Sequence, residues 1–204
     1  MIKHVLRIDS SARPNESVSR RLGDEVVRRL ASRHPDLQID HVDLSAGMAH
    51  IDADWIGANF TPPGQRDAEA RARLAGSDDA VAQLIRADAV VLTAPVYNFS
   101  VPSALKAWID HVCRAGLTFR YTADGPQGLV VDKPVFLAMA SGGVPFGSDV
   151  DFASTYLKQV FSFIGIEDVR LIGAERVAKD AEAAYAAASQ QLNEWLPATS
   201  GEAA

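Results

Sequence analysis

The chain has 204 residues, of which 48% are hydrophobic and 23% are charged, and its formal net charge is −6. This balance is typical of a globular domain, and the acidic surplus predicts neither a nucleic-acid partner nor an anionic membrane surface. No apolar run is long enough to span a bilayer, and Asp9 interrupts the first apolar run where a secretory signal would have to continue. A single cysteine, Cys113, excludes an internal disulfide, so we expect a cytoplasmic protein.

Short β-type runs alternate with longer helix-type segments, which is the pattern of βαβ units around a parallel sheet. The run at residues 89–94 is continuously apolar, as expected of a central strand covered on both faces. The predicted strands span residues 4–8, 37–44, 89–94, 134–139 and 168–172. We therefore predict an α/β fold with a doubly wound five-stranded parallel sheet and helices on both faces.

Helical periodicity marks several of the intervening segments. Apolar residues recur every four positions from Val18 to Leu30, so they share one helix face. Another helix is predicted to start near Pro102, with Ser100 as its N-cap. Two further helices are predicted over residues 152–164 and 180–195.

The remaining segments carry weaker patterns. Residues 46–66 are expected to form irregular chain on the surface. No internal repeat or linker divides the chain, so residues 1–196 are predicted to form one domain. Residues 197–204 are expected to be a frayed tail.

Ligands of open parallel sheets bind at the carboxyl ends of the strands, where the strand order reverses. The first strand is followed by a hydroxyl-rich loop that opens directly into a helix. Helix-start N–H groups attract anions, and Ser11, Ser17 and Ser19 add hydroxyl donors beside Val18. This donor set suits a terminal phosphate monoester such as that of FMN, although Ser17 can equally be a plain helix cap. The loop matches neither the dinucleotide-binding nor the triphosphate-binding glycine motif.

The loops after the third and fourth strands add aromatic and glycine residues. Tyr97 and Phe99 can line a flat ring while Asn98 reaches its polar edge, although aromatic residues at a strand end are more often core residues. Gly142 and Gly143 let backbone approach a ligand, although such a pair is more often only a turn. The coincidence of three such signals at three strand ends favours a binding site.

Other kinds of site are not indicated. The five histidines are scattered without metal-ligand spacing, so no metal is expected, and no G-x-S-x-G motif indicates a hydrolase. Cys113 is expected to be a buried, inert thiol. The arginines of the first helix are interpreted mostly as its solvated face, with Arg13 and Arg20 softening the field near the phosphate. No catalytic side chain is predicted, because a bound flavin would carry the redox chemistry itself.

Three segments resemble the FMN-dependent NADH:quinone oxidoreductases, also called azoreductases. They are Ala94-Pro95-Val96-Tyr97-Asn98-Phe99, the run from Arg114 to Thr122 that contains Ala-Gly-Leu-Thr-Phe-Arg-Tyr, and Gly125-Pro126-Gln127-Gly128-Leu129. The resemblance extends from the first strand to Phe163-Ile164-Gly165-Ile166 and the last strand.

The resemblance implies a flavodoxin-like sheet of order 2-1-3-4-5, and a homodimer with one FMN per subunit and active sites at the subunit interface. It places the phosphate on Ser11 and on Ser17, Val18 and Ser19. It places the flavin ring on two segments, which are Pro95, Val96, Tyr97, Asn98 and Phe99, and then Ala140, Ser141, Gly142 and Gly143.

Two positions depart from the family pattern. Members often carry Met where this chain has Val96, and since both residues are apolar little should change. Some members carry Ser-Arg where this chain has Ala140-Ser141. Loss of that arginine could alter the preference for substrate or for NADH against NADPH.

The implied mechanism alternates two substrates at one flavin. Hydride would pass from NADH to the flavin, and a quinone would then take up one electron pair, which predicts ping-pong kinetics. An azo compound would need two such cycles to give two amines. Backbone N–H groups near Asn98 and Gly142-Gly143 would stabilise negative charge on the reduced ring. Phe119 and Phe163 are candidate aromatic walls of the substrate pocket, although each can also be a simple core residue.

Two rival classes share this fold. An electron-transfer flavodoxin would lack a substrate pocket, but this chain has only a mild net charge and lacks the Thr-rich phosphate loop of such carriers. A receiver-type signalling domain would need an acidic cluster after the first strand and an aspartate after the third. This chain has Ser10-Ser11 and Pro95-Val96-Tyr97 at those places.

Overall fold

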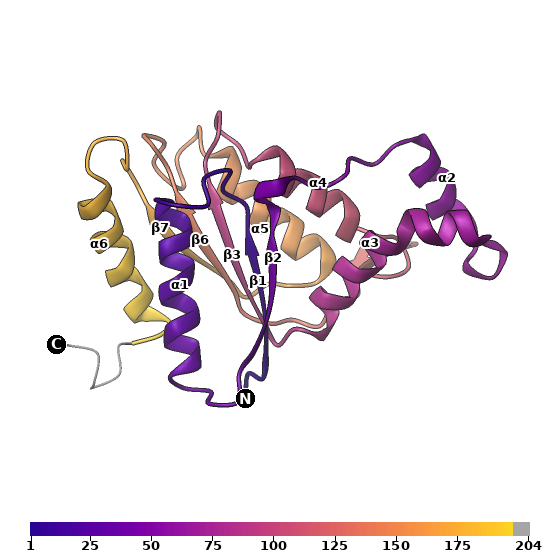
Figure 1. Ribbon diagram of the computed structural model, residues 1–204, viewed down its shortest axis with the longest axis horizontal. Coiled ribbons are helices and arrows are strands. Elements are labelled where there is room, and N and C mark those ends of the chain that lie inside the picture. Colours follow the sequence, from indigo (N-terminus) through magenta and orange to yellow (C-terminus); the bar gives the residue numbers. More distant parts are fainter. Residues whose placement is uncertain (198–204) are drawn as a thin grey trace.

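A five-stranded parallel sheet forms the centre of the molecule in the computed structural model, which describes residues 1–197 (Figure 1). Its strand order is β2-β1-β3-β6-β7, so the predicted order 2-1-3-4-5 of the parallel strands is confirmed. The strands are β1 (His4–Asp9), β2 (Gln38–Asp43), β3 (Ala89–Pro95), β6 (Val135–Ala140) and β7 (Val169–Ala174). Every predicted strand is present, and its ends lie within two residues of the predicted ends.

Helices cover both faces of the sheet (Figure 1). Apolar residues of α1 (Val18–Ala31) and α6 (Ala181–Gln191) pack with Val5, Val91 and Ile172 on one face. The other face is covered by α3 (Ala68–Arg86), α4 (Ser103–Val112) and α5 (Phe152–Ile164). Because both faces are buried, β3 and β6 are apolar along almost their whole length. None of the helices within residues 1–197 has the length and apolar content needed to cross a membrane.

The segment that we expected to be irregular contains a helix. Residues 53–60 form α2 (Ala53–Phe60), which Asp52 caps by accepting a hydrogen bond from the backbone N–H of Trp55 at 2.7 Å. Trp55 is only 6% exposed and packs with Leu74 of α3, so this part of the segment is anchored by a small core of its own. Figure 1 shows α2 and the start of α3 projecting from the body of the molecule.

A two-stranded antiparallel hairpin, which the sequence did not predict, connects α4 to β6. It consists of β4 (Phe119–Thr122) and β5 (Gly125–Gly128). Its second strand lies directly on the end of α5, where a Cβ at Gly128 would be 2.2 Å from the backbone nitrogen of Gly165. The close approach of β5 to α5 therefore depends on glycine at position 128.

Two other helix boundaries differ from the prediction. Ser100 does not cap α4: Pro102 is the N-cap residue, no described side chain caps the helix, and Ser100 belongs to a tight turn instead. The last α-helix ends at Gln191 and continues as the 3-10 turn Leu192–Glu194. Two further 3-10 turns span Leu44–Ala46 and Pro63–Gln65. Apart from Pro197, the predicted tail at residues 197–204 lies outside the described residues.

Candidate functional site

Four loops converge at the carboxyl edge of the sheet around a pocket of about 250 Å³. The loops follow β1, β3, β6 and β7, and the pocket lies where the order of the strands reverses between β1 and β3. Its lining consists of Ser11, Arg13, Glu16, Ser17, Val18, Pro95, Val96, Tyr97, Ala140, Gly142 and Val177.

Most of the predicted cofactor-binding residues meet in this pocket. Those that line it are Ser11, Ser17, Val18, Pro95, Val96, Tyr97, Ala140 and Gly142. The predicted residues that do not line it are Ser19, Asn98, Phe99, Ser141 and Gly143. Sequence reasoning missed Glu16, which lies inside the predicted loop, and Val177, which follows the last strand. The same edge-of-sheet rule applied to the fifth strand would have identified Val177.

The loop after β1 has the donors that a phosphate group needs. Ser17 caps α1 by accepting a long hydrogen bond of 3.5 Å from the backbone N–H of Arg20, and its hydroxyl lies 3.1 Å from that of Ser19. Within residues 1–197 the backbone N–H groups of Val18 and Ser19 have no acceptor, as is usual in the first turn of a helix. Capping and anion binding are therefore compatible here, because the cap leaves the N–H groups of Val18 and Ser19 without an acceptor and the Ser17 hydroxyl at the pocket.

The loop after β3 begins with a strained turn. Tyr97 and Ser100 each donate a backbone hydrogen bond to the carbonyl of the other, at 2.9 and 3.0 Å. Between them Asn98 (φ +49°) and Phe99 (φ +69°) both have left-handed backbone, as in a type I′ turn. This conformation is uncommon for Phe, and such strain tends to be kept at functional sites. Phe99 is 55% exposed and Tyr97 is 36% exposed, so neither is a core residue.

The loop after β6 is fixed by Ser141, which is fully buried. Its hydroxyl accepts a hydrogen bond from the backbone N–H of Val144 at 2.8 Å, and its carbonyl accepts one from that of Val177 at 3.0 Å. Ser141 therefore organises two loops from beneath the pocket. Its side chain offers no contact to a ligand.

The positive charge on α1 is arranged differently from the prediction. Arg20 and Arg29 are not part of a solvated face, because they are 9% and 4% exposed. Arg20 pairs with Asp43, and its hydrogen bonds to that carboxylate hold the pKa of Asp43 far below its usual range. Arg13 is exposed and does line the pocket.

A larger groove of about 900 Å³ adjoins the pocket and shares Tyr97 with it. It runs between the start of α4 and the start of α5, and Asn98, Phe152 and Tyr156 contribute to its lining. Burial raises the pKa of the Tyr156 hydroxyl to about 12, so this phenol stays neutral. The groove is wide, partly aromatic and close to the pocket.

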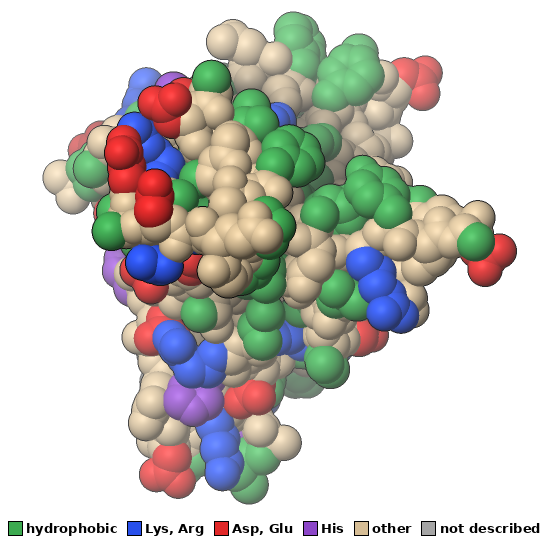
Figure 2. Space-filling view, turned by 90° about the vertical axis from the view of Figure 1, so that its right-hand side faces the viewer, with side chains coloured by type: hydrophobic (Ala, Val, Ile, Leu, Met, Phe, Trp, Pro, Cys, Tyr) green, Lys and Arg blue, Asp and Glu red, His purple; other side chains and the backbone are tan. Residues whose placement is uncertain are grey.

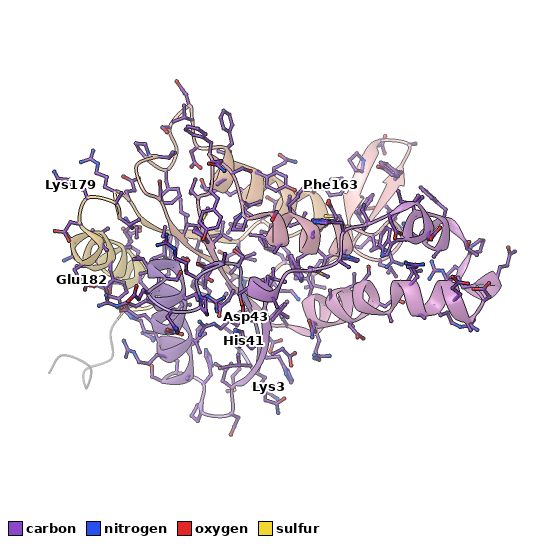
Figure 3. The ribbon with its side chains drawn as sticks, turned by 45° about the horizontal axis from the view of Figure 1, so that its top comes forward. Lys3, His41, Asp43, Phe163, Lys179 and Glu182 are labelled. Carbon is purple, nitrogen blue, oxygen red and sulfur yellow. The ribbon has the colours of Figure 1, made fainter. Side chains whose placement is uncertain are left out.

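Phe119 and Phe163 lie together but away from the pocket. Their ring centroids are 4.5 Å apart, beside the hairpin at the end of α5. Phe163 is eleven residues after Phe152, which corresponds to roughly 16 Å along the helix. Figure 3 shows Phe163 on the opposite side of the molecule from Lys179, which belongs to the loop after β7. Neither ring lines the pocket or the groove of its own chain.

No group of three or more metal-binding side chains occurs in the part of the chain that the structure describes. Cys113 directly follows α4 and is partly buried. Its burial raises the pKa of the thiol to about 11, so the sulfur is protonated at neutral pH.

Comparison with known proteins places the chain in a well-populated group. Residues 3–196 match the family model described as flavodoxin-like fold. The FMN-dependent NADH:quinone oxidoreductase 1 of Jannaschia sp. (strain CCS1) is 46% identical over 189 residues, which cover 93% of this chain and 96% of that protein. The FMN-dependent NADH:quinone oxidoreductase of Thiobacillus denitrificans is 48% identical over 172 residues, which cover 84% of each chain.

Solved structures agree with these relatives. An FMN-dependent NADH-azoreductase from Bacillus anthracis str. Ames Ancestor, in complex with FMN, superposes with a TM-score of 0.85 at 25% identity, covering 95% of this chain and 97% of that chain. An azoreductase from Bacillus anthracis str. Sterne gives a TM-score of 0.82 at 28% identity, covering 95% and 96%. The fold, the pocket at its switch point and these relatives together show that the chain belongs to the FMN-dependent NADH:quinone oxidoreductase family.

Proposed function

We propose that this chain is an FMN-dependent oxidoreductase that takes hydride from NADH and reduces quinones by two electrons in a ping-pong cycle. Azo compounds are proposed as further acceptors, reduced to amines in two cycles. The observation that supports this best is the convergence of predicted residues from three separate loops on one pocket, at the place where flavodoxin-like folds bind their ligand. The identity of the cofactor and of both substrates is taken from the names of the relatives.

The pocket fits FMN at both of its ends. The free N–H groups of Val18 and Ser19, with the hydroxyls of Ser11 and Ser17, suit the terminal phosphate. The ring would lie against Pro95, Val96 and Tyr97 from one loop and against Ala140 and Gly142 from another. Asn98, Phe99, Ser141 and Gly143, which do not line the pocket, would act from its edge or from beneath it. When bound, FMN supplies the redox chemistry by accepting hydride and passing on an electron pair.

The protein would contribute binding, orientation and charge stabilisation. Backbone N–H groups at Asn98 and Gly142-Gly143 lie in loops beside the pocket, where they would stabilise negative charge on a reduced ring. One pocket with one adjoining groove is consistent with two substrates that bind in turn. No described side chain has to act as a catalytic acid or base in this scheme.

We also propose a homodimer with the active sites at the subunit interface. Exposed aromatic side chains next to the groove, which are Tyr97, Phe99 and Phe152, would be covered in a dimer. Figure 2 shows hydrophobic side chains gathered on the upper right of one face of the molecule. Phe163 near the end of α5 and Phe119 of the hairpin do not line the pocket of their own chain, so we propose that they serve the partner's site. Sedimentation at twice the monomer mass would support this arrangement, and a monomer at micromolar concentration would contradict it.

An anaerobic spectrum tests the proposal directly. The purified protein, incubated with FMN and desalted, should show flavin absorption that bleaches with NADH and returns with a benzoquinone. A protein that stays colourless would overturn the cofactor assignment. A yellow protein that NADH cannot bleach would instead indicate an electron carrier of the flavodoxin type.

The single unpaired cysteine and the need for NADH support a cytoplasmic location.

A further inference from the structure

Two carboxylates lie side by side beneath the loop after β1. Asp9 and Asp43 are register partners at the ends of the adjacent strands β1 and β2. Asp9 is 1% exposed and accepts hydrogen bonds from the hydroxyl of Thr93 at 2.8 Å and from Arg7 at 3.0 Å, and its carboxylate lies 2.8 Å from His41 Nε2. Figure 3 shows His41 and Asp43 next to each other on β2. Neighbouring carboxylates repel each other when both are charged, and a cation between them relieves that repulsion.

Arg20, from the first turn of α1, supplies that cation. Its Nη1 and Nη2 donate to the two carboxylate oxygens of Asp43 at 2.9 and 2.7 Å. The same two nitrogens also reach Asp9 at 3.5 Å and the backbone carbonyl of Ser11 at 3.0 Å. A single guanidinium therefore joins β1, β2 and the loop that follows β1.

None of the five N–H donors of Arg20 is left for a ligand. Four are directed at Asp43, Asp9 and Ser11, and the fifth, on Nε, is buried without a partner among the described residues. The positive charge of Arg20 is also balanced locally by the two carboxylates. Arg20 thus has no donor with which to bind a phosphate. Arg13 differs, because it is exposed at the pocket.

We propose that Arg20, held by Asp43, is a positioning residue for the phosphate-binding loop. It fixes the backbone at Ser11 from below, so that Ser11 and the start of α1 face the ligand in a preformed arrangement. This inference rests on the proposed function, because it concerns the loop assigned to the FMN phosphate. If Arg20 has this role, loss of Arg20 weakens the binding of the phosphate group and leaves the binding of the flavin ring unchanged.

A comparison of FMN with riboflavin, which lacks the phosphate, separates these effects. Dissociation constants for both flavins would be measured on the apoprotein by fluorescence quenching. For Arg20→Ala we expect the Kd of FMN to rise about tenfold, as for loss of one charge-assisted hydrogen bond, and the Kd of riboflavin to stay nearly unchanged. Equal increases for both flavins, or no increase for FMN, would overturn the assignment.

Asp43→Asn provides a second test that does not remove the arginine. If Arg20 acted as a cation for the phosphate, freeing it from Asp43 would tighten FMN binding. A positioning role predicts the opposite, since a neutral amide at position 43 holds the guanidinium less firmly and the Kd of FMN should rise. Tighter binding would therefore overturn the proposal even where Arg20→Ala folds poorly.

Arg29→Ala is the matched control, because Arg29 is also buried on α1 and also pairs with a carboxylate, that of Glu25. It should lower thermal stability and leave the ratio of the two dissociation constants unchanged. Wild-type apoprotein that binds neither flavin would overturn both this assignment and the proposed function. Wild type that prefers FMN, with an unchanged preference in both Arg20→Ala and Asp43→Asn, would overturn this assignment alone.

Discussion

Gly23 of α1 packs so closely on Thr93 of β3 that a Cβ atom at position 23 would lie 2.4 Å from Thr93 Cγ2. Thr93 is fully buried, and its hydroxyl is committed to a hydrogen bond with Asp9. It therefore has little freedom to give way. The distance of α1 from the sheet, and with it the position of Ser17 at the start of the helix, depends on glycine at this place.

Gly23→Ala should consequently destabilise the protein. We expect the free energy of unfolding to fall by about 1–3 kcal/mol, as for other overpacked positions, measured by urea denaturation. Gly76→Ala in α3 is the control, because a Cβ there would meet nothing within 4 Å. The control should stabilise the helix by up to about 1 kcal/mol. Similar effects of the two substitutions would contradict the close-packing argument.

The turn at Asn98-Phe99 stores backbone strain that glycine would release. Phe99→Gly and Phe99→Ala both remove the exposed ring, but only alanine keeps the penalty of a positive φ. We expect Phe99→Gly to be about 1 kcal/mol more stable than Phe99→Ala in thermal denaturation. Equal stability of the two variants would show that the turn is not strained.

The Arg20–Asp43 pair predicts a specific pH dependence. Arg20 lowers the pKa of Asp43 in the folded state, so the pair stabilises the fold above the ordinary carboxyl pKa of about 4, and this stabilisation is lost as the pH falls from there through the folded pKa. The free energy of unfolding of wild type should exceed that of Asp43→Asn at pH 7. The difference should narrow below about pH 4 in urea titrations. A difference that stays constant down to about pH 3 would disprove the linkage.

Cys113 should react slowly with alkylating agents. Its pKa of about 11 leaves far less thiolate at mildly alkaline pH than an ordinary cysteine has. We expect iodoacetamide to modify the native protein about two orders of magnitude more slowly than the urea-unfolded protein. Comparable rates in the two states, followed by mass spectrometry, would show that the thiol is neither shielded nor perturbed.

The sheet could be predicted because its signals are local. The continuous apolar run at residues 89–94 reflects a strand that is buried on both faces. The four-residue spacing from Val18 to Leu30 reflects a helix that is buried on one face. The hairpin had no comparable signal. Its second strand, Gly-Pro-Gln-Gly, lacks β-forming residues and depends on the contact of Gly128 with Gly165. Similarly, α2 is short and depends on Trp55 docking against α3.

The candidate site was predictable where it follows the geometry of the sheet. Residues after β1, β3 and β6 meet because parallel strands end at the same edge. The role of Arg20 was not predictable, because its partner Asp43 is brought to it only by the β1–β2 register. A helix arginine with distant carboxylate partners looks, in sequence, like any solvent-exposed arginine.

The pocket has walls from four loops, and the last of them, at Val177, follows β7, the fifth parallel strand along the chain. A ribosome must therefore synthesise all five strands of the parallel sheet before all of these walls exist. A nascent chain that stops after β6 lacks one wall and the hydrogen bond from Val177 to Ser141 that ties two loops together. Loading of the proposed flavin in this pocket would thus wait until all five strands have been synthesised, and chains that terminate before Val177 would not withdraw flavin from the cell.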